Sequence, residues 1–134
     1  MRALSLSLAL GALPLAALAD GGVAVPLADV SGLSPAQAEE LLTALVTANV
    51  VSSNCPGFGI TDGEWTLITG TADRLAYEEL GLSVDDYDAR FYGPAFALLD
   101  QPGTCEAEGP KVRGIVQLLV DMGGSPVPVG PAKG

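Results

Sequence analysis

The sequence predicts a small all-α protein, a four-helix bundle closed by one disulfide. Apolar residues recur at helical spacing in four segments, and capping signals bound most of these segments. The chain also contains two cysteines, Cys55 and Cys105. The 134 residues are 49% hydrophobic and 16% charged, which suits one small folded domain. We divide the chain into a signal peptide (1–19), an extended lead-in (20–33), a helical domain (34–124) and a disordered or extended tail (125–134).

The N-terminus has the order of a secretory signal peptide. Met1-Arg2 forms a positive start, an apolar run follows over residues 3–16, and Ala17-Leu18-Ala19 closes it, which predicts cleavage before Asp20. A membrane anchor is the alternative, but the run is short and contains a glycine and a proline. We therefore expect a soluble periplasmic protein with no stable membrane insertion after cleavage.

The lead-in and the first helix are separated by a capping signal. Pro26 keeps the lead-in from becoming helical. Ser34 is the expected N-cap, with Pro35 at the first helical position and Gln37 completing a capping box. The helix should run to about Ser53. Its predicted core face consists of Ala38, Leu41, Leu42, Leu45, Val46 and Ala48.

A second capping box, Thr61 with Glu64, opens the next predicted helix. Gly81 ends it as a C-cap glycine. The residues that follow one face of this helix are Trp65, Ile68, Ala72, Leu75, Ala76, Glu79 and Leu80.

Ser83 is the expected cap of a third helix, and Pro94 should kink or break it because proline removes the backbone donor that would pair with Arg90. The fourth helix opens at Thr104 or around Gly109-Pro110 and ends at a pair of glycines. The predicted core residues of these two helices are Tyr87, Phe91, Ala95, Leu98, Val112, Ile115, Val116, Leu119 and Met122.

The two cysteines, Cys55 and Cys105, are expected to form a disulfide if the chain is exported to an oxidising compartment. They close a loop of about fifty residues, for which the chain-entropy model gives roughly 4 kcal/mol of stabilisation. A redox role usually needs a C-x-x-C pair or a lone activated thiol, and neither is present.

Composition excludes several function classes. The chain has no histidine, which rules out imidazole-based catalysis and histidine-ligated zinc. Without the leader, five basic residues stand against sixteen acidic ones, so the net charge is −11. The electrostatic field of this negative charge repels nucleic acids and anionic lipid headgroups. The charge therefore serves to bind a basic partner, to bind a cation or only to keep the protein soluble.

All seven aromatic residues fall between positions 58 and 96. Trp65, Tyr87 and Phe91 lie on predicted core faces. Tyr77 and Tyr92 fall off those faces, and we predict that they contact a partner protein at the surface.

The densest acidic cluster is Asp85, Asp86 and Asp88. It is a candidate cation site or the carboxylate pair of a small hydrolase or lyase. An EF-hand loop requires a glutamate at its twelfth position, where Phe96 or Ala97 stands instead. Complementation of the helix dipole at a helix start is the simpler interpretation, and we expect no cofactor and no metal.

After a signal peptide, Asn54-Cys55-Pro56 lies at the end of the first helix, two helical segments follow, and Cys105 lies at the last helix. This order of features along the chain resembles that of small exported proteins of unknown function from the Rhodobacter group of alphaproteobacteria. This resemblance implies a periplasmic location and a helical fold, and it carries over no functional residue. A looser likeness of architecture links the chain to acid-stress periplasmic chaperones, which are also small, helical and joined by one disulfide.

These observations favour a non-enzymatic periplasmic protein that binds another protein, either as an accessory subunit or as a stress chaperone. A carboxylate-dependent hydrolase or lyase and a cation-binding module are the alternatives. An acid-triggered chaperone would lose native carboxylate interactions on protonation and expose its aromatic segment.

Overall fold

The computed structural model describes residues 23–130, so the predicted signal peptide and its cleavage site lie outside the described residues. The described chain is all-helical, as predicted, and no strand occurs between residues 23 and 130. The helical segments are α1 (Pro35–Asn54), α2 (Asp62–Asp73), η1 (Arg74–Glu79), α3 (Val84–Tyr87), η2 (Asp88–Tyr92), α4 (Gly93–Leu98), α5 (Thr104–Glu108) and α6 (Lys111–Asp121).

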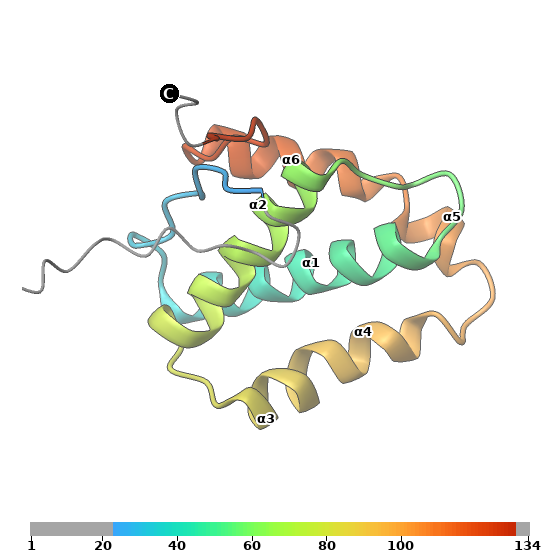
Figure 1. Cartoon of the computed structure of the whole chain (residues 1–134). Helices are drawn as coiled ribbons and strands as arrows, with labels where there is room; N and C mark the ends of the chain where they lie inside the picture. Colours follow the sequence, from blue (N-terminus) through green and yellow to red (C-terminus); the bar gives the residue numbers. More distant parts are fainter. Residues whose placement is uncertain (1–22, 131–134) are drawn as a thin grey trace, which may run out of the picture.

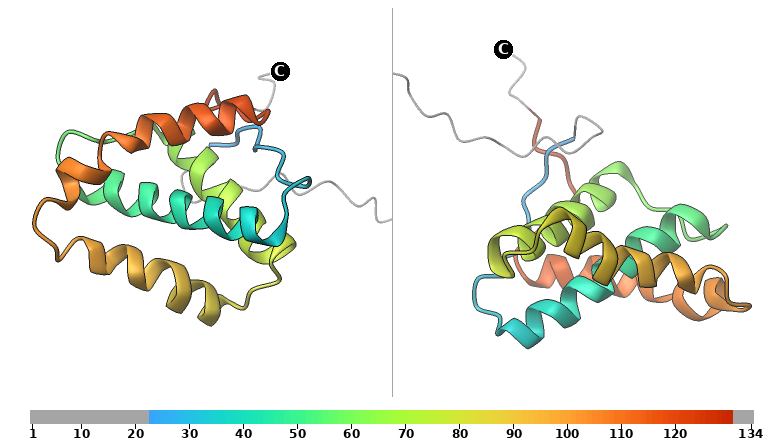
Figure 2. Two further views of the ribbon diagram at one scale, coloured as in Figure 1. Left: turned by 180° about the vertical axis from the view of Figure 1, so that it is seen from behind. Right: turned by 90° about the horizontal axis from the view of Figure 1, so that it is seen from below.

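Helix α1 is the centre of the molecule (Figures 1 and 2). Helix α6 lies on one side of it and the continuous α3–η2–α4 helix lies on the other, while α2 crosses over one face of α1. No helix between residues 23 and 130 is long and apolar enough to cross a membrane.

The first capping box forms as predicted. Ser34 Oγ accepts a hydrogen bond from the backbone N–H of Gln37 at 3.2 Å, and the Gln37 side chain accepts one from the Ser34 N–H at 2.9 Å. Every residue on the predicted core face of α1 is buried. Helix α1 ends at Asn54, one residue beyond the expected end.

The second helix also begins at its predicted capping box, Thr61 with Glu64. It continues through the π-helical segment η1, where the Leu80 N–H donates to the Leu75 carbonyl at 2.9 Å. Three residues of the predicted core face differ from expectation, and one of them, Leu80, is half-buried just after η1. Trp65 is only half-buried, because its indole reaches towards a polar side chain of α1, and Glu79 is exposed at the end of η1, where the wider π turn changes the register.

The third helix remains helical through Pro94, so of the two predicted outcomes, a kink or a break, the break does not occur. The residues before the proline adopt the π-helix η2, in which the Gly93 N–H donates to the Asp88 carbonyl five residues earlier. A π turn is a recognised way to change the hydrogen-bond ladder within a helix. The missing proline donor is therefore accommodated by a change of register.

Both predicted starts of the fourth helix are helix starts in the structure. Thr104 begins α5, and α6 begins directly after Pro110. Of the five core residues predicted here, Val112, Val116 and Leu119 are buried, whereas Ile115 and Met122 are half-buried.

The lead-in and the tail lie along each other. The Ser125 N–H donates to the Pro26 carbonyl at 3.0 Å, and the Val129 N–H donates to the Ala24 carbonyl at 2.8 Å. Residues 125–130 are thus held against the lead-in by hydrogen bonds and do not show the predicted disorder, and residues 131–134 lie outside the described part of the chain. We call residues 23–30 and 124–130 together the strap.

The strap approaches α2 closely. A Cβ atom on Gly63, in the first turn of α2, would overlap the backbone carbonyl oxygen of Pro126. A Cβ on Gly124 would lie 2.7 Å from a methyl carbon of Leu67 and 3.0 Å from the backbone nitrogen of Ala28. The absence of side chains at these two glycines allows the backbone of the strap to pack directly on the core.

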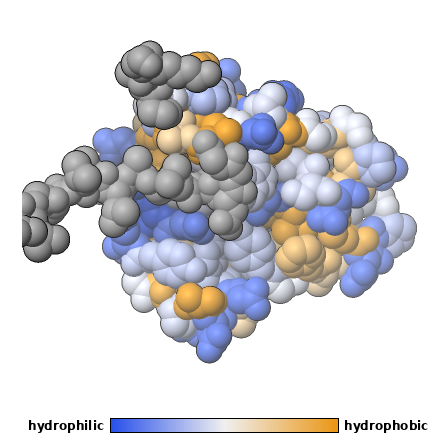
Figure 3. All heavy atoms as spheres, viewed as in Figure 1, coloured by the Kyte–Doolittle hydropathy of each residue, from blue (hydrophilic) through white to orange (hydrophobic). Residues whose placement is uncertain are grey.

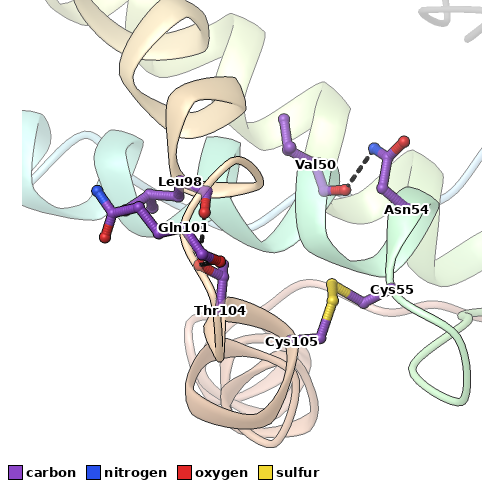
Figure 4. Close-up of a disulfide and its surroundings, with 7 residues drawn as sticks. All are labelled: Val50, Asn54, Cys55, Leu98, Gln101, Thr104 and Cys105. Atoms are coloured by element: carbon purple, nitrogen blue, oxygen red, sulfur yellow. Dashed lines mark hydrogen bonds between the residues drawn. A yellow bond between two sulfur atoms is a disulfide. The ribbon is translucent and has the colours of Figure 1, made fainter.

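Cys55 and Cys105 form the predicted disulfide (Figure 4). Their Cα atoms are 5.4 Å apart, and the bond joins the end of α1 to α5. The Thr104 hydroxyl also ties α5 to the end of α4, because it lies within hydrogen-bond distance of the carbonyl oxygens of Leu98 and Gln101.

Glu64 connects α2 to α6. One carboxylate oxygen completes the capping box by accepting from the Thr61 N–H at 3.0 Å, and both oxygens pair with the guanidinium of Arg113. The Glu64 side chain is buried, and the Arg113 hydrogen bonds lower the pKa of its carboxyl. This carboxylate therefore favours folding only while it is ionised.

Candidate functional site

A concave feature lies between α1 and α6. It consists of two adjacent hollows, of about 490 and about 270 Å³, which share Glu40 and Ala44 as lining residues. The larger hollow extends towards the ends of α4 and α5, where Leu98 and Glu108 line it. The smaller one reaches Leu33 beside the start of α1. We call this feature the α1/α6 groove.

The two helices run antiparallel along the groove, because the C-terminal half of α1 faces the start of α6 and its N-terminal half faces the end of α6. Several of the lining side chains on each helix lie three or four residues apart and so form a stripe along one face. The stripe on α1 consists of Gln37, Glu40, Ala44 and Thr47, and the stripe on α6 consists of Lys111, Ile115 and Leu118 and is continued by Met122 just beyond the end of the helix. Spacing of this kind places side chains on one face of a helix, and such a face is what a further helix can pack against.

The stripe on α1 has short side chains in its C-terminal half, and the stripe on α6 has long side chains, which are apolar except for Lys111. Ala44 and Thr47 are half-buried at the base of the larger hollow. Ile115 is half-buried, and Leu118 is 41% exposed although it is a large apolar residue. The groove thus offers apolar area to a ligand and has a base that a second backbone can approach.

Three charged residues line the groove: Glu40, Glu108 and Lys111. Lys111 Nζ lies 3.2 Å from Glu108 Oε1, three residues earlier in the chain, so these two charges form a pair at one end. Glu40 lines both hollows and has no ion-pair partner among the described residues. Its neighbour Glu39 instead pairs with Arg90 of η2 at 3.1 Å.

Other exposed apolar residues are dispersed. On the face of the molecule seen in Figure 3, apolar residues form separate patches between hydrophilic ones. Phe96 of α4 is 51% exposed and Val84 of α3 is 68% exposed, but neither lines one of the two hollows of the groove. The groove is therefore distinguished by shape as well as by apolar character.

Tyr77 and Tyr92, the predicted protein-contact residues, join an aromatic cluster around buried Tyr87. The ring centroids of Tyr77 and Tyr87 are 5.5 Å apart, and those of Tyr87 and Tyr92 are 5.2 Å apart. Tyr77 is 43% exposed, whereas Tyr92 is half-buried and its hydroxyl accepts a hydrogen bond from Asn49 Nδ2 at 3.1 Å. Trp65 Nε1 donates to Asn49 Oδ1, the oxygen of the side-chain amide, at 3.1 Å.

This cluster has the contacts of a structural element. The tyrosine rings pack against one another, and the Asn49 side chain forms hydrogen bonds with both Trp65 and Tyr92. Burial raises the pKa of Tyr87 and also that of the nearby Asp73 carboxyl, which accepts a hydrogen bond from the Tyr87 hydroxyl at 3.4 Å. A contact role for Tyr77 and Tyr92 stays a prediction.

The structure leaves Asp85, Asp86 and Asp88 exposed at the start of the third helix. The backbone N–H of Asp86 donates to Ser83 Oγ at 3.0 Å, so Ser83 caps this helix as expected. Within residues 23–130, no three histidine, cysteine, aspartate or glutamate side chains are grouped so as to hold a metal ion. None of the three aspartates lines either hollow.

Comparison with known proteins returns no matching family model, curated protein or solved structure.

Sequence reasoning did not identify the α1/α6 groove. The sequence predicts Ile115 and Met122 as core residues, and nothing in it distinguishes Glu40 from other exposed acidic residues. The signal for the groove is the stripe on α1, which lies outside the predicted core face of that helix. In this stripe Ala44 and Thr47 follow Glu40, whereas a face exposed only to solvent is expected to be polar. Short side chains on an outward face indicate close approach by another element.

Proposed function

We propose that the protein, once exported to the periplasm, acts as a non-enzymatic accessory subunit that binds a helix of another protein in the α1/α6 groove. The observation that carries this proposal is the pair of adjacent hollows between two antiparallel helices, lined by side chains that share one face of each helix. The groove supplies apolar contact area and a shape that a single helix of three to four turns would fill.

The location in the proposal is supported by the signal-like leader and by the disulfide. Disulfides persist in oxidising compartments, and Cys55–Cys105 fixes α5 against α1 at the end of the groove. The fixed walls favour one dedicated partner over the many clients of a stress chaperone. The occupant is expected to be basic, because the exported chain carries a net charge of −11.

Site-specific crosslinking tests this function. A photo-reactive amino acid is placed at Leu118 inside the groove, and at Phe96 on α4 as a control of similar exposure. Both variants are expressed with the leader, irradiated in cells and analysed by mass spectrometry. We expect one stoichiometric adduct from Leu118 whose crosslinked peptide is an amphipathic helix, and none from Phe96.

A groove-filling variant completes the test. Ala44→Trp projects a large side chain into both hollows, and it should abolish the Leu118 adduct while the protein remains folded. Many different adducts that appear only at acid pH would instead support the chaperone hypothesis. An adduct from Phe96 that persists in Ala44→Trp would contradict the groove as the binding site.

A further inference from the structure

The single unpaired charge in the groove specifies what its occupant must carry. Glu40 lines both hollows and therefore lies at the midpoint of the groove. The other two charges in the lining, Glu108 and Lys111, pair with each other at one end at 3.2 Å. A helix bound along the groove would place the middle of its apolar stripe over the Glu40 carboxylate.

A carboxylate covered by an apolar side chain loses hydration without gaining a partner, which is unfavourable. A lysine or arginine at the middle of the bound stripe would pair with it and would also fix the register of the two helices. A single polar position within an otherwise apolar seam has this effect in coiled coils. The acidic field of the whole chain acts in the same direction.

A second copy of this chain is a poor occupant for the same reason. In a two-fold symmetric pair built on this groove, residues at its midpoint meet their own counterparts across the axis. The Glu40 carboxylates would then approach each other, and each chain would also bring a net charge of −11. Like charges in that arrangement oppose association.

We infer that the α1/α6 groove recognises an amphipathic helix of a basic partner protein whose apolar stripe carries one lysine or arginine at its centre, paired with Glu40. This inference rests on the proposed function and adds the specificity-determining residue. Glu40 is exposed and takes no part in the core, so its substitution changes recognition without changing the fold.

The test uses two synthetic helical peptides of about fifteen residues. They share one apolar stripe and differ only at its centre, which is lysine in one and glutamate in the other. Binding to the chain from Asp20 onward is measured by fluorescence anisotropy. We expect the lysine peptide to bind about fivefold more tightly, as is usual for a partly exposed ion pair, and the preference to shrink at 0.5 M salt.

Glu40→Lys should reverse this order, and Glu40→Gln should remove it. The matched control is Glu39→Lys, which makes the same change of charge one residue away at a side chain that pairs with Arg90 and does not line either hollow. The control should keep the wild-type preference. Circular dichroism melting curves would establish that all three variants are folded.

The possible results separate the two claims. Saturable binding of both peptides with equal affinity, blocked by Ala44→Trp, would overturn the role of Glu40 and leave the groove function standing. Failure of both peptides to bind would overturn both. A dimer in light scattering that becomes tighter in Glu40→Gln would identify a second copy as the occupant and would also overturn the inference.

Discussion

The two sides of α1 are built in different ways. On one side, α1 packs against α2, and the strap closes over the start of α2 at Gly63 and Gly124. On the other side, hollows of about 490 and 270 Å³ lie between α1 and α6, and no described element fills them. The first side is closed by specific contacts, and the second presents an unfilled seam.

This difference separates residues that stabilise from residues available for recognition. The closed side contains the buried Glu64 carboxylate and its Arg113 partner, which join α2 to α6. The open side contains Glu40, whose charge has no partner among the described residues. Changes on the closed side should therefore alter stability, and changes on the open side should alter binding.

Loss of the disulfide is expected to have the largest effect because it acts on both sides. Cys55→Ala with Cys105→Ala frees α5 from the end of α1 and should lower the free energy of unfolding by about 4 kcal/mol. Urea denaturation of the double variant checks the value. A loss below about 1 kcal/mol would show that the helical contacts alone hold α5 in place.

The strap packs closely on α2 only because residue 63 is a glycine, and Gly63→Ala should displace the strap from α2. The added Cβ overlaps the Pro126 carbonyl, so the tail must move, and overpacking of this kind usually destabilises a protein by about 1 to 3 kcal/mol. Gly114→Ala is the matched control on α6, because nothing lies within 4 Å of its Cβ. The control should gain about 0.5 to 1 kcal/mol from helix propensity. Thermal unfolding of both variants measures the difference.

The Glu64–Arg113 pair predicts how the closed side responds to acid. The pKa of the Glu64 carboxyl is lowered in the folded state. The stabilisation from the pair is therefore complete above the pKa of an unfolded glutamate, about 4.3, and is lost as the pH falls through the lower pKa of the folded state. Glu64→Gln keeps a capping-box acceptor but loses the charge. It should cost about 1 kcal/mol at pH 7 and show a weaker loss of stability between pH 5 and pH 2.

Asp73 provides the control for this pH dependence, because its pKa is raised by burial and its effect has the opposite sign. Asp73→Asn should leave the protein as stable or more stable at pH 7. Denaturation curves across pH for both variants decide the matter. Equal pH slopes in wild type and Glu64→Gln would show that the pair does not govern acid stability.

On the open side, Ala44→Met is expected to change stability least. The longer side chain enters an existing hollow and overlaps no closely packed neighbour, so the free energy of unfolding should change by less than about 0.5 kcal/mol. Binding of the central-lysine peptide should nevertheless weaken at least tenfold. Unchanged binding would place the ligand elsewhere.

Much of the fold was predictable because the local signals were strong. The capping boxes at Ser34 and Thr61, the core face of α1 and the Cys55–Cys105 bridge were all predicted, because each depends on residues close in sequence or on a unique pairing. The π-helical segments η1 and η2 were not, since a π turn differs from an α turn only in which carbonyl each N–H reaches, and the periodicity of apolar residues does not specify that choice. Sequence patterns do not contain that information.

The groove was missed because it depends on the distance between two helices. Glu40, Ala44 and Thr47 are ordinary surface residues of α1 until α6 is placed beside them. The same holds for Leu118, whose exposure follows from the position of α6 relative to α1. Helical periodicity predicts which residues share a face, but it does not predict how far apart two faces lie.

The central claim is that the α1/α6 groove binds a helix, and amide chemical shifts measured during titration with the central-lysine peptide test it most directly. We predict shifts at Glu40, Ala44, Ile115 and Leu118 and across their stripes, with the amides of α3 and η2 unchanged. Shifts confined to the aromatic cluster around Tyr77 would contradict the account and would move the binding site to the opposite side of α1.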